Sequence, residues 1–301
     1  MFKFIQRNII LLISTFIIVL ISFPILYLQS INKPVLKPIE VTKKIDIGTT
    51  FQSEFELLKL ENSKYQVIYW KWTPETDGNL SDNLDKVISS KDIPIIMVEP
   101  YLYLEKSESI FNKIIEGNYL PAINNLCKLV DSKKTQVYLS FGHSMDINDK
   151  TIYPWANDDG PNYNLAYKYF QKKCKEKTTF AKYMWSPDGS GYIEQFYPGK
   201  DKVDLVGLAA FQKEAKNYLP FQNLFDPKYT KAKKYKQPIL IFKLGVEGSE
   251  ELKNKWIKNA KERIYDIDLQ RYVAGFIYFQ TENIQLKPSQ PTITQTNQPK
   301  L

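Results

Sequence analysis

The chain has 301 residues, of which 43% are hydrophobic and 14% aromatic, so it can build a large core and is neither disordered nor fibrous. Its net charge of +8 comes from lysines scattered along the chain, which indicates a solvated surface and no nucleic-acid partner. Two cysteines (Cys127 and Cys174) and one histidine (His143) exclude a disulfide-rich scaffold and a multi-histidine or four-cysteine metal site. We therefore expect no metal, no cofactor and two buried thiols.

The N-terminus carries an uncharged apolar run over residues 9–28, preceded by Lys3 and Arg7. About 20 such residues span a bilayer core of about 30 Å. No good cleavage site follows the run, which favours an uncleaved signal anchor over a removed signal peptide. We predict a transmembrane segment within residues 1–28. The long C-terminal part is expected outside the cytoplasm, in a periplasmic or extracellular position.

Two polar stretches delimit the domain that follows. Residues 29–44 contain Pro34 and Pro38 and are typical of a linker, whereas residues 285–301 are rich in Pro, Gln, Thr and Ser and predict a disordered tail. One domain is therefore expected over residues 45–284.

Short apolar runs recur through this domain and predict eight strands, at 45–49, 66–71, 93–99, 136–142, 180–185, 203–208, 238–244 and 273–279. Their apolarity is continuous, as in parallel strands buried on both faces. Amphipathic segments lie between most of them and predict helices at 79–89, 120–132, 162–177, 217–234 and 249–265. This alternation predicts a (β/α)8 TIM-type barrel. The alternative, an open doubly wound sheet, lacks a glycine-rich phosphate loop after the first strand.

The carboxyl ends of the predicted strands are where such barrels carry their active sites. Four of the five tryptophans fall in or next to these ends, namely Trp70, Trp72, Trp155 and Trp185. Aromatic rings in an open cleft can stack against the C–H face of a sugar. We therefore predict carbohydrate binding, with Trp70, Trp155, Trp185 and Tyr197 as stacking surfaces.

Most of the predicted barrel resembles glycoside hydrolase family 26, the β-mannanase-like (β/α)8 barrels. The resemblance rests on the order and spacing of short motifs: Met97-Val98-Glu99-Pro100, Ile115-Glu116-Gly117-Asn118-Tyr119, Gly142-His143-Ser144-Met145, Tyr153-Pro154-Trp155, Met184-Trp185-Ser186-Pro187, Tyr197-Pro198-Gly199 and Phe242-Lys243-Leu244-Gly245. It implies a polysaccharide or oligosaccharide as ligand, with His143 among the residues that contact it.

The departures from this pattern concern the catalytic positions. The resemblance implies a glutamate acid/base directly after His143, where this chain has Ser144, and a glutamate nucleophile where it has Lys243. Retaining glycosidases need two carboxylates about 5–5.5 Å apart. Serine is too weak an acid for the first role, and a protonated lysine cannot act as the nucleophile. The sequence therefore predicts a barrel that binds glycan and has lost catalysis.

Other assignments stay open. Asp146 and Glu247 lie near the two lost positions and could act as displaced carboxylates in an active retaining β-glycosidase. A Ser144–Lys243 pair for acyl transfer is a third option, although no Gly-x-Ser-x-Gly motif accompanies it. If catalysis is lost, Lys243 is expected to favour anionic sugars. A membrane-tethered barrel of this kind also suits a polysaccharide synthesis or export machinery as partner.

Overall fold

The computed structural model describes residues 46–51, 63–71, 77–100, 109–147, 149–156, 160–213 and 218–279. All of them belong to one unit of the chain, residues 43–301. The predicted anchor, linker and tail, together with Trp72, lie outside the described residues. Within those residues, no helix has the length and apolarity needed to cross a membrane.

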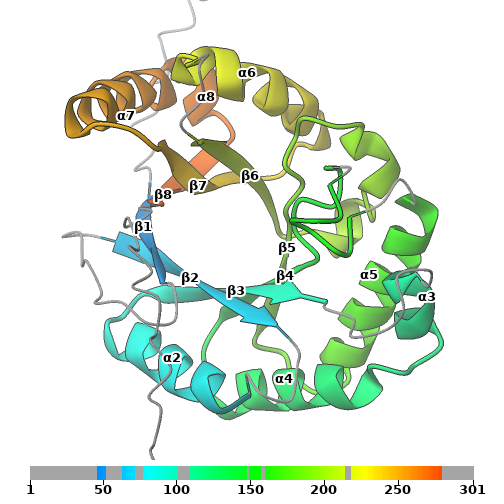
Figure 1. The fold of residues 1–301 in the computed structure, drawn as a ribbon. Coiled ribbons are helices and arrows are strands. Elements are labelled where there is room, and N and C mark those ends of the chain that lie inside the picture. Colours follow the sequence, from blue (N-terminus) through cyan, green and yellow to red (C-terminus); the bar gives the residue numbers. More distant parts are fainter. Residues whose placement is uncertain are drawn as a thin grey trace, which may run out of the picture. The chain divides into compact units, whose positions relative to one another are not determined.

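The predicted barrel of eight parallel strands is confirmed. Eight parallel strands close into a ring in sequence order, and β1 pairs with β8 (Figure 1). The strands are β1 (Asp46–Phe51), β2 (Ser63–Lys71), β3 (Ile93–Glu99), β4 (Val137–Phe141), β5 (Ala181–Trp185), β6 (Leu205–Gln212), β7 (Ile239–Val246) and β8 (Val273–Tyr278). Because all strands are parallel, their carboxyl ends meet at one end of the ring, which we call the mouth.

Helices cover the outside of the ring (Figure 1). They are α2 (Asp77–Ser89), α3 (Ile110–Ile115), α4 (Leu120–Ser132), α5 (Gly160–Lys175), α6 (Phe221–Ala232), α7 (Glu250–Ile264) and α8 (Ile267–Gln270), with 3₁₀ helices η2 (Ile193–Phe196), η3 (Lys200–Lys202) and η4 (Lys233–Tyr235). The crossover from β5 to β6 has only η2 and η3, because glycines and prolines interrupt residues 186–204.

Two sets of buried side chains alternate along the strands. On β2, Val67 faces the barrel interior, whereas Ile68 and Trp70 face the helices. The interior of the barrel is filled by residues such as Ile95, Met97, Leu240 and Phe242. The larger set lies between sheet and helices, and we call it the outer layer. This alternation follows from the two-residue period of a strand.

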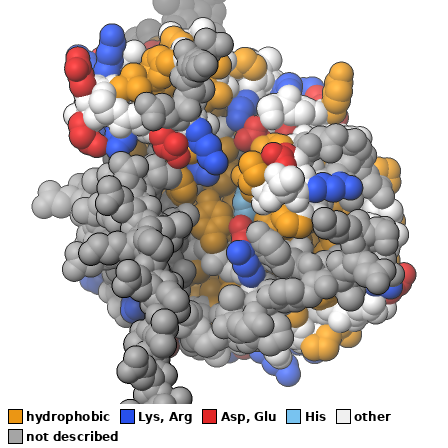
Figure 2. All heavy atoms as spheres, viewed as in Figure 1, with side chains coloured by type: hydrophobic (Ala, Val, Ile, Leu, Met, Phe, Trp, Pro, Cys, Tyr) orange, Lys and Arg blue, Asp and Glu red, His pale blue; other side chains and the backbone are white. Residues whose placement is uncertain are grey.

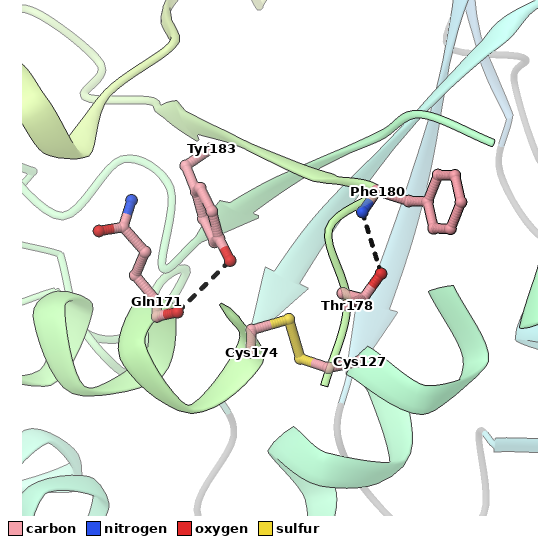
Figure 3. Close-up of a disulfide and its surroundings, with 6 residues drawn as sticks. All are labelled: Cys127, Gln171, Cys174, Thr178, Phe180 and Tyr183. Atoms are coloured by element: carbon pink, nitrogen blue, oxygen red, sulfur yellow. Dashed lines mark hydrogen bonds between the residues drawn. A yellow bond between two sulfur atoms is a disulfide. The ribbon is translucent and has the colours of Figure 1, made fainter. Parts of the chain in front are cut away.

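The prediction of two buried thiols was wrong, because Cys127 and Cys174 form a disulfide (Figure 3). Cys127 lies on α4 and Cys174 on α5, the helices on either side of β4 in the chain. Both cysteines belong to the buried faces of these helices, and their Cα atoms are 5.2 Å apart, as a disulfide requires. Sequence spacing did not reveal the pair, since the contact exists only once α4 and α5 pack side by side.

Candidate functional site at the barrel mouth

The mouth opens into a hollow with largely hydrophobic walls and with acidic and basic side chains around it (Figure 2). Titratable groups reach this region from several strands. Glu99 ends β3, His143 follows β4, and Lys243 lies near the end of β7. We call these three residues the mouth triad. Their positions follow from the carboxyl-end geometry that the sequence predicted.

His143 is almost completely buried by aromatic rings. The rings of Tyr69, Tyr153 and Trp155 lie 5.6, 5.3 and 5.3 Å from its imidazole. Its Nδ1 has no hydrogen-bond partner. Burial and the nearby charge of Lys243 lower the pKa of His143 to about 3, so the imidazole is neutral at physiological pH.

Glu99 lies beside this histidine, with Oε1 3.9 Å from His143 Nε2. Burial raises the pKa of Glu99 to about 7, and the neighbouring Lys71 of β2 partly opposes the shift. A fraction of Glu99 is therefore a neutral carboxylic acid at pH 7. Because both partners are mostly or partly neutral, this contact is not a full ion pair.

Lys243 reaches the mouth at an irregularity of β7. The pairing register with β8 shifts between Ile241 and Leu244, so Phe242 and Lys243 oppose the single residue Ile277 and β7 carries one extra residue, as in a β-bulge. The Nζ of Lys243 lies 4.1 Å from the ring centroid of Phe279 and 4.5 Å from that of Phe211. Burial lowers its pKa to about 8, with a further contribution from the charge of Lys213. Most of the amine is still protonated at pH 7.

Ser144 follows His143 with a left-handed backbone, at φ 55°. Its N–H donates to the carbonyl oxygen of Ser186 over 2.7 Å, and its side chain is hydrogen-bonded to the Tyr153 hydroxyl. The side chain is buried, and no hydrogen bond joins it to Lys243 within the described ranges. Ser144 therefore stands in the loop above β4, without the contact that an acyl-transfer pair with Lys243 needs.

Asp146 anchors two loops to each other. Its carboxylate accepts backbone N–H bonds from Asp188 (2.6 Å), Gly189 (2.9 Å) and Gly191 (3.1 Å). Gly191 has to be glycine, since a Cβ there would collide with the carbonyl oxygen of Asp146. Burial raises the pKa of Asp146, and the carboxylate that adds to this shift is Asp188 rather than Glu247. Asp146 is thus held in a structural role.

Glu247 lies just beyond the end of β7. Its backbone N–H donates to the carbonyl oxygen of Gln212, at the end of β6. Its side chain is half-buried, and its charge raises the pKa of Lys243. Glu247 therefore acts on Lys243, whereas nothing in the described residues links it to Asp146.

In the part of the chain that the structure describes, the expected open tryptophan surfaces are not found. Trp70 and Trp185 belong to the outer layer and face the helices, with exposed fractions of 4% and 0%. Trp155 lies near the mouth but is 1% exposed, and its Nε1–H donates to the carbonyl oxygen of His143 over 2.7 Å. Its role in this structure is to hold the His143 loop.

Tyr197 was also expected in the cleft and lies elsewhere. Its ring stacks on Tyr235 of η4 at 4.0 Å and meets Trp185 edge-on at 5.1 Å. These partners place it on the helix-facing side of the sheet, in the β5–β6 crossover. The expectation failed because Tyr197 lies late in the connection from β5 to β6. At this point the chain has left the mouth and runs back toward the start of β6.

Sequence reasoning missed the aromatic residues that do line or rim the mouth. Tyr69, Phe211 and Phe279 lie around the mouth triad. Tyr192, in the loop after β5, is 84% exposed, and Tyr218, before α6, is 38% exposed. The usable signal for Tyr69, Phe211 and Phe279 was their place at or just beyond the carboxyl ends of strands. Among the described residues, no group of three or more His, Cys, Asp or Glu side chains could hold a metal ion.

Comparisons with known proteins agree with this architecture. No family model matches the chain, and no curated protein matches it. Solved structures do. The endo-β-1,4-mannanase catalytic domain of glycoside hydrolase family 26 from Bacillus sp. JAMB-750 superposes with a TM-score of 0.61 at 14% identity, over 78% of this chain and 77% of that one.

Two further mannanases of the same family are similar. The Bacteroides ovatus enzyme gives a TM-score of 0.56 at 14% identity, over 79% of this chain and 81% of its own. The Cellulomonas fimi enzyme gives a TM-score of 0.60 at 13% identity, over 78% of this chain and 64% of its own. The predicted resemblance is confirmed at the level of a divergent family-26-like fold. Identities this low concern the fold alone.

Proposed function

We propose that this protein is a membrane-tethered barrel outside the cytoplasm that binds a glycan without cleaving it. The observation that carries the proposal is Lys243, whose ammonium occupies the mouth between the rings of Phe211 and Phe279. The resemblance assigns a catalytic carboxylate to this position. A cation there cannot attack an anomeric carbon or stabilise the positive charge of an oxocarbenium-like transition state.

The second catalytic position supports loss of hydrolysis as well. Ser144 offers an alcohol, which is too weak an acid to protonate a glycosidic oxygen. Asp146, its nearest substitute, already accepts three backbone N–H bonds. An active glycosidase built on Asp146 and Glu247 is the alternative, and it requires the β4 and β5 loops to separate.

Glycan binding is supported by the shape and chemistry of the mouth. It combines an apolar hollow with buried polar groups, among them the unpartnered Nδ1 of His143. The exposed rings of Tyr192 and Tyr218 are available for stacking against sugars. The structures with the same fold include enzymes named as β-1,4-mannanases, which makes β-1,4-linked mannans the first glycans to test.

The compartment is supported by two features. Residues 9–28 have the length and apolarity of a membrane anchor. The Cys127–Cys174 disulfide is of a kind that persists in oxidising environments and is rare in the cytosol. A polysaccharide synthesis or export machinery is the partner class that suits such a placement.

Binding and cleavage are tested separately on the full-length protein in a mild detergent. Titration with β-1,4-manno-oligosaccharides, followed by chromatography of the same mixtures, is expected to show binding and no shortened products. Measurable turnover would overturn the non-catalytic assignment. Turnover that disappears in Glu247→Gln would identify the alternative as correct.

Protease accessibility tests the location. In intact spheroplasts, added protease is expected to degrade the barrel, whereas a cytoplasmic marker stays protected. Protection of the barrel would contradict an extracytoplasmic position. A mature chain that starts near residue 30 would contradict an uncleaved anchor.

A further inference from the structure

Among the described residues, the Lys243 ammonium has no counter-ion within ion-pairing distance. In the part of the chain that the structure describes, no acceptor lies within hydrogen-bonding or ion-pairing distance of its Nζ, and its contacts are the two rings. Phe211 and Phe279 meet edge-on, with centroids 5.0 Å apart, and together form a fixed aromatic seat for the charge. Ring faces attract a cation but accept none of its three N–H bonds in the way an oxygen does.

The carboxylates nearest to Lys243 are engaged elsewhere or remain outside contact distance. Asp188 pairs with Lys228, whose Nζ is 2.8 Å from Oδ2. Lys228 also donates to the carbonyl oxygen of Ala209, so this pair is fixed from both sides. Glu247 influences Lys243 only as a charge in its surroundings. Burying an unpaired ammonium is unfavourable, and an incoming anion would remove this cost.

We propose that Lys243 binds an acidic group of the glycan, namely the carboxylate of a uronic acid residue. This inference rests on the proposed function and names its ligand class. A single carboxylate balances the single ammonium. A phosphate would bring a second negative charge close to Asp188 and Glu247. The apolar walls that seat the lysine stem also suit the C–H face of the same sugar ring.

A matched pair of ligands provides the test. The β-1,4-linked trimers of mannose and of mannuronate differ only at C6, where a hydroxymethyl group replaces the carboxylate. Titration of the full-length protein is expected to give at least about tenfold tighter binding of the mannuronate trimer, equivalent to about 1.4 kcal/mol.

Variants assign the preference to one side chain. Lys243→Met keeps the length and apolar stem, so it is expected to bring the ratio of the two affinities close to one. Lys258→Met removes the same charge from the exposed face of α7 and is expected to keep the wild-type ratio. A preference that survives in Lys243→Met would overturn the inference.

The remaining outcomes separate the two proposals. Equal binding of both trimers by the wild type would overturn the acidic-ligand inference and leave glycan binding standing. Failure of both trimers to bind would overturn both proposals for this glycan class. Acetate that competes as well as the mannuronate trimer, mole for mole, would indicate a bare anion site and would overturn the glycan assignment.

Discussion

The outer layer and the mouth differ in how completely their side chains are packed and paired. In the outer layer, large aromatic rings such as Trp185, Tyr163 and Phe170 are fully buried and pack against one another. In the mouth triad, His143 is buried and Glu99 and Lys243 are partly buried, their pairing is incomplete, and each pKa moves in the direction that favours the neutral form. The outer layer therefore stabilises the fold. The mouth instead contains ionisable groups that destabilise the fold but can contact a ligand.

The largest effect is expected from the outer layer. Trp185→Ala should lower the free energy of unfolding by about 3–5 kcal/mol, because it leaves a cavity beside Tyr197 and Tyr235. Urea unfolding followed by far-ultraviolet circular dichroism measures the change. Tyr192→Ala, at an 84% exposed ring, is the control and should stay within about 0.5 kcal/mol of the wild type. Equal losses in both variants would contradict the division into two regions.

Loss of the disulfide between α4 and α5 is expected to give the second largest effect. Replacing both Cys127 and Cys174 with serine should lower the free energy of unfolding by about 2–4 kcal/mol, because the bond closes a loop with a sequence separation of 47. The same urea titration measures it, and a reducing agent should reproduce the loss in the wild type but not in the double variant. A reductant-insensitive wild type would mean that the bond does not form.

In the mouth, removing a charge should stabilise the fold. Lys243→Met is expected to raise the free energy of unfolding at pH 7 by about 1–3 kcal/mol, since the buried ammonium is penalised. The pKa of Lys243 is about 8 in the fold and 10.5 as its ordinary value, so the unfolded chain binds more protons between these limits. Wild-type stability should therefore rise with pH from about 8 to about 10.5.

That rise should be absent in Lys243→Met and present in Lys258→Met. Unfolding midpoints measured across this pH range distinguish the two variants. If Lys243→Met is less stable than the wild type at pH 7, Lys243 stabilises the fold and the prediction is wrong.

Glu99 should give the smallest effect, with the opposite sign along the pH axis. Its pKa of about 7 exceeds the ordinary 4.5, so the folded chain binds more protons in this window and stability falls as pH rises through it. His143, with its pKa lowered to about 3, makes stability rise between about 3 and 6.5 and partly masks the fall. Glu99→Gln should be about 1–2 kcal/mol more stable than the wild type at pH 7 and indistinguishable from it near pH 4. The same difference at both pH values would rule out titration of Glu99 as its cause.

Much of the fold could be predicted from the sequence. The strand expected at 93–99 is β3 (Ile93–Glu99), and the helix expected at 120–132 is α4 (Leu120–Ser132). Long apolar or amphipathic runs carry enough periodic signal to be located. The elements α3 and α8 were missed because they span only 6 and 4 residues, too few for a helical period to show.

The site was only partly predictable. The sequence placed His143 and Ser144 after a strand end and Lys243 near one, and the barrel brings these ends together. The tryptophans were misjudged for a physical reason. A strand buried on both faces is apolar at every position, so its sequence does not tell which side chains face the ligand and which face the helices.

By itself, the sequence determined the barrel class and the identities at the two positions where the family resemblance implies glutamates, because periodicity and local motifs are properties of neighbouring residues. Tertiary structure alone decided which face Trp185 occupies, that Cys127 meets Cys174, and that Lys243 is seated between Phe211 and Phe279. Each of these depends on residues far apart in the chain. Their contacts, and the desolvation that shifts the pKa of Lys243, arise only when the ring of strands closes and the helices pack around it.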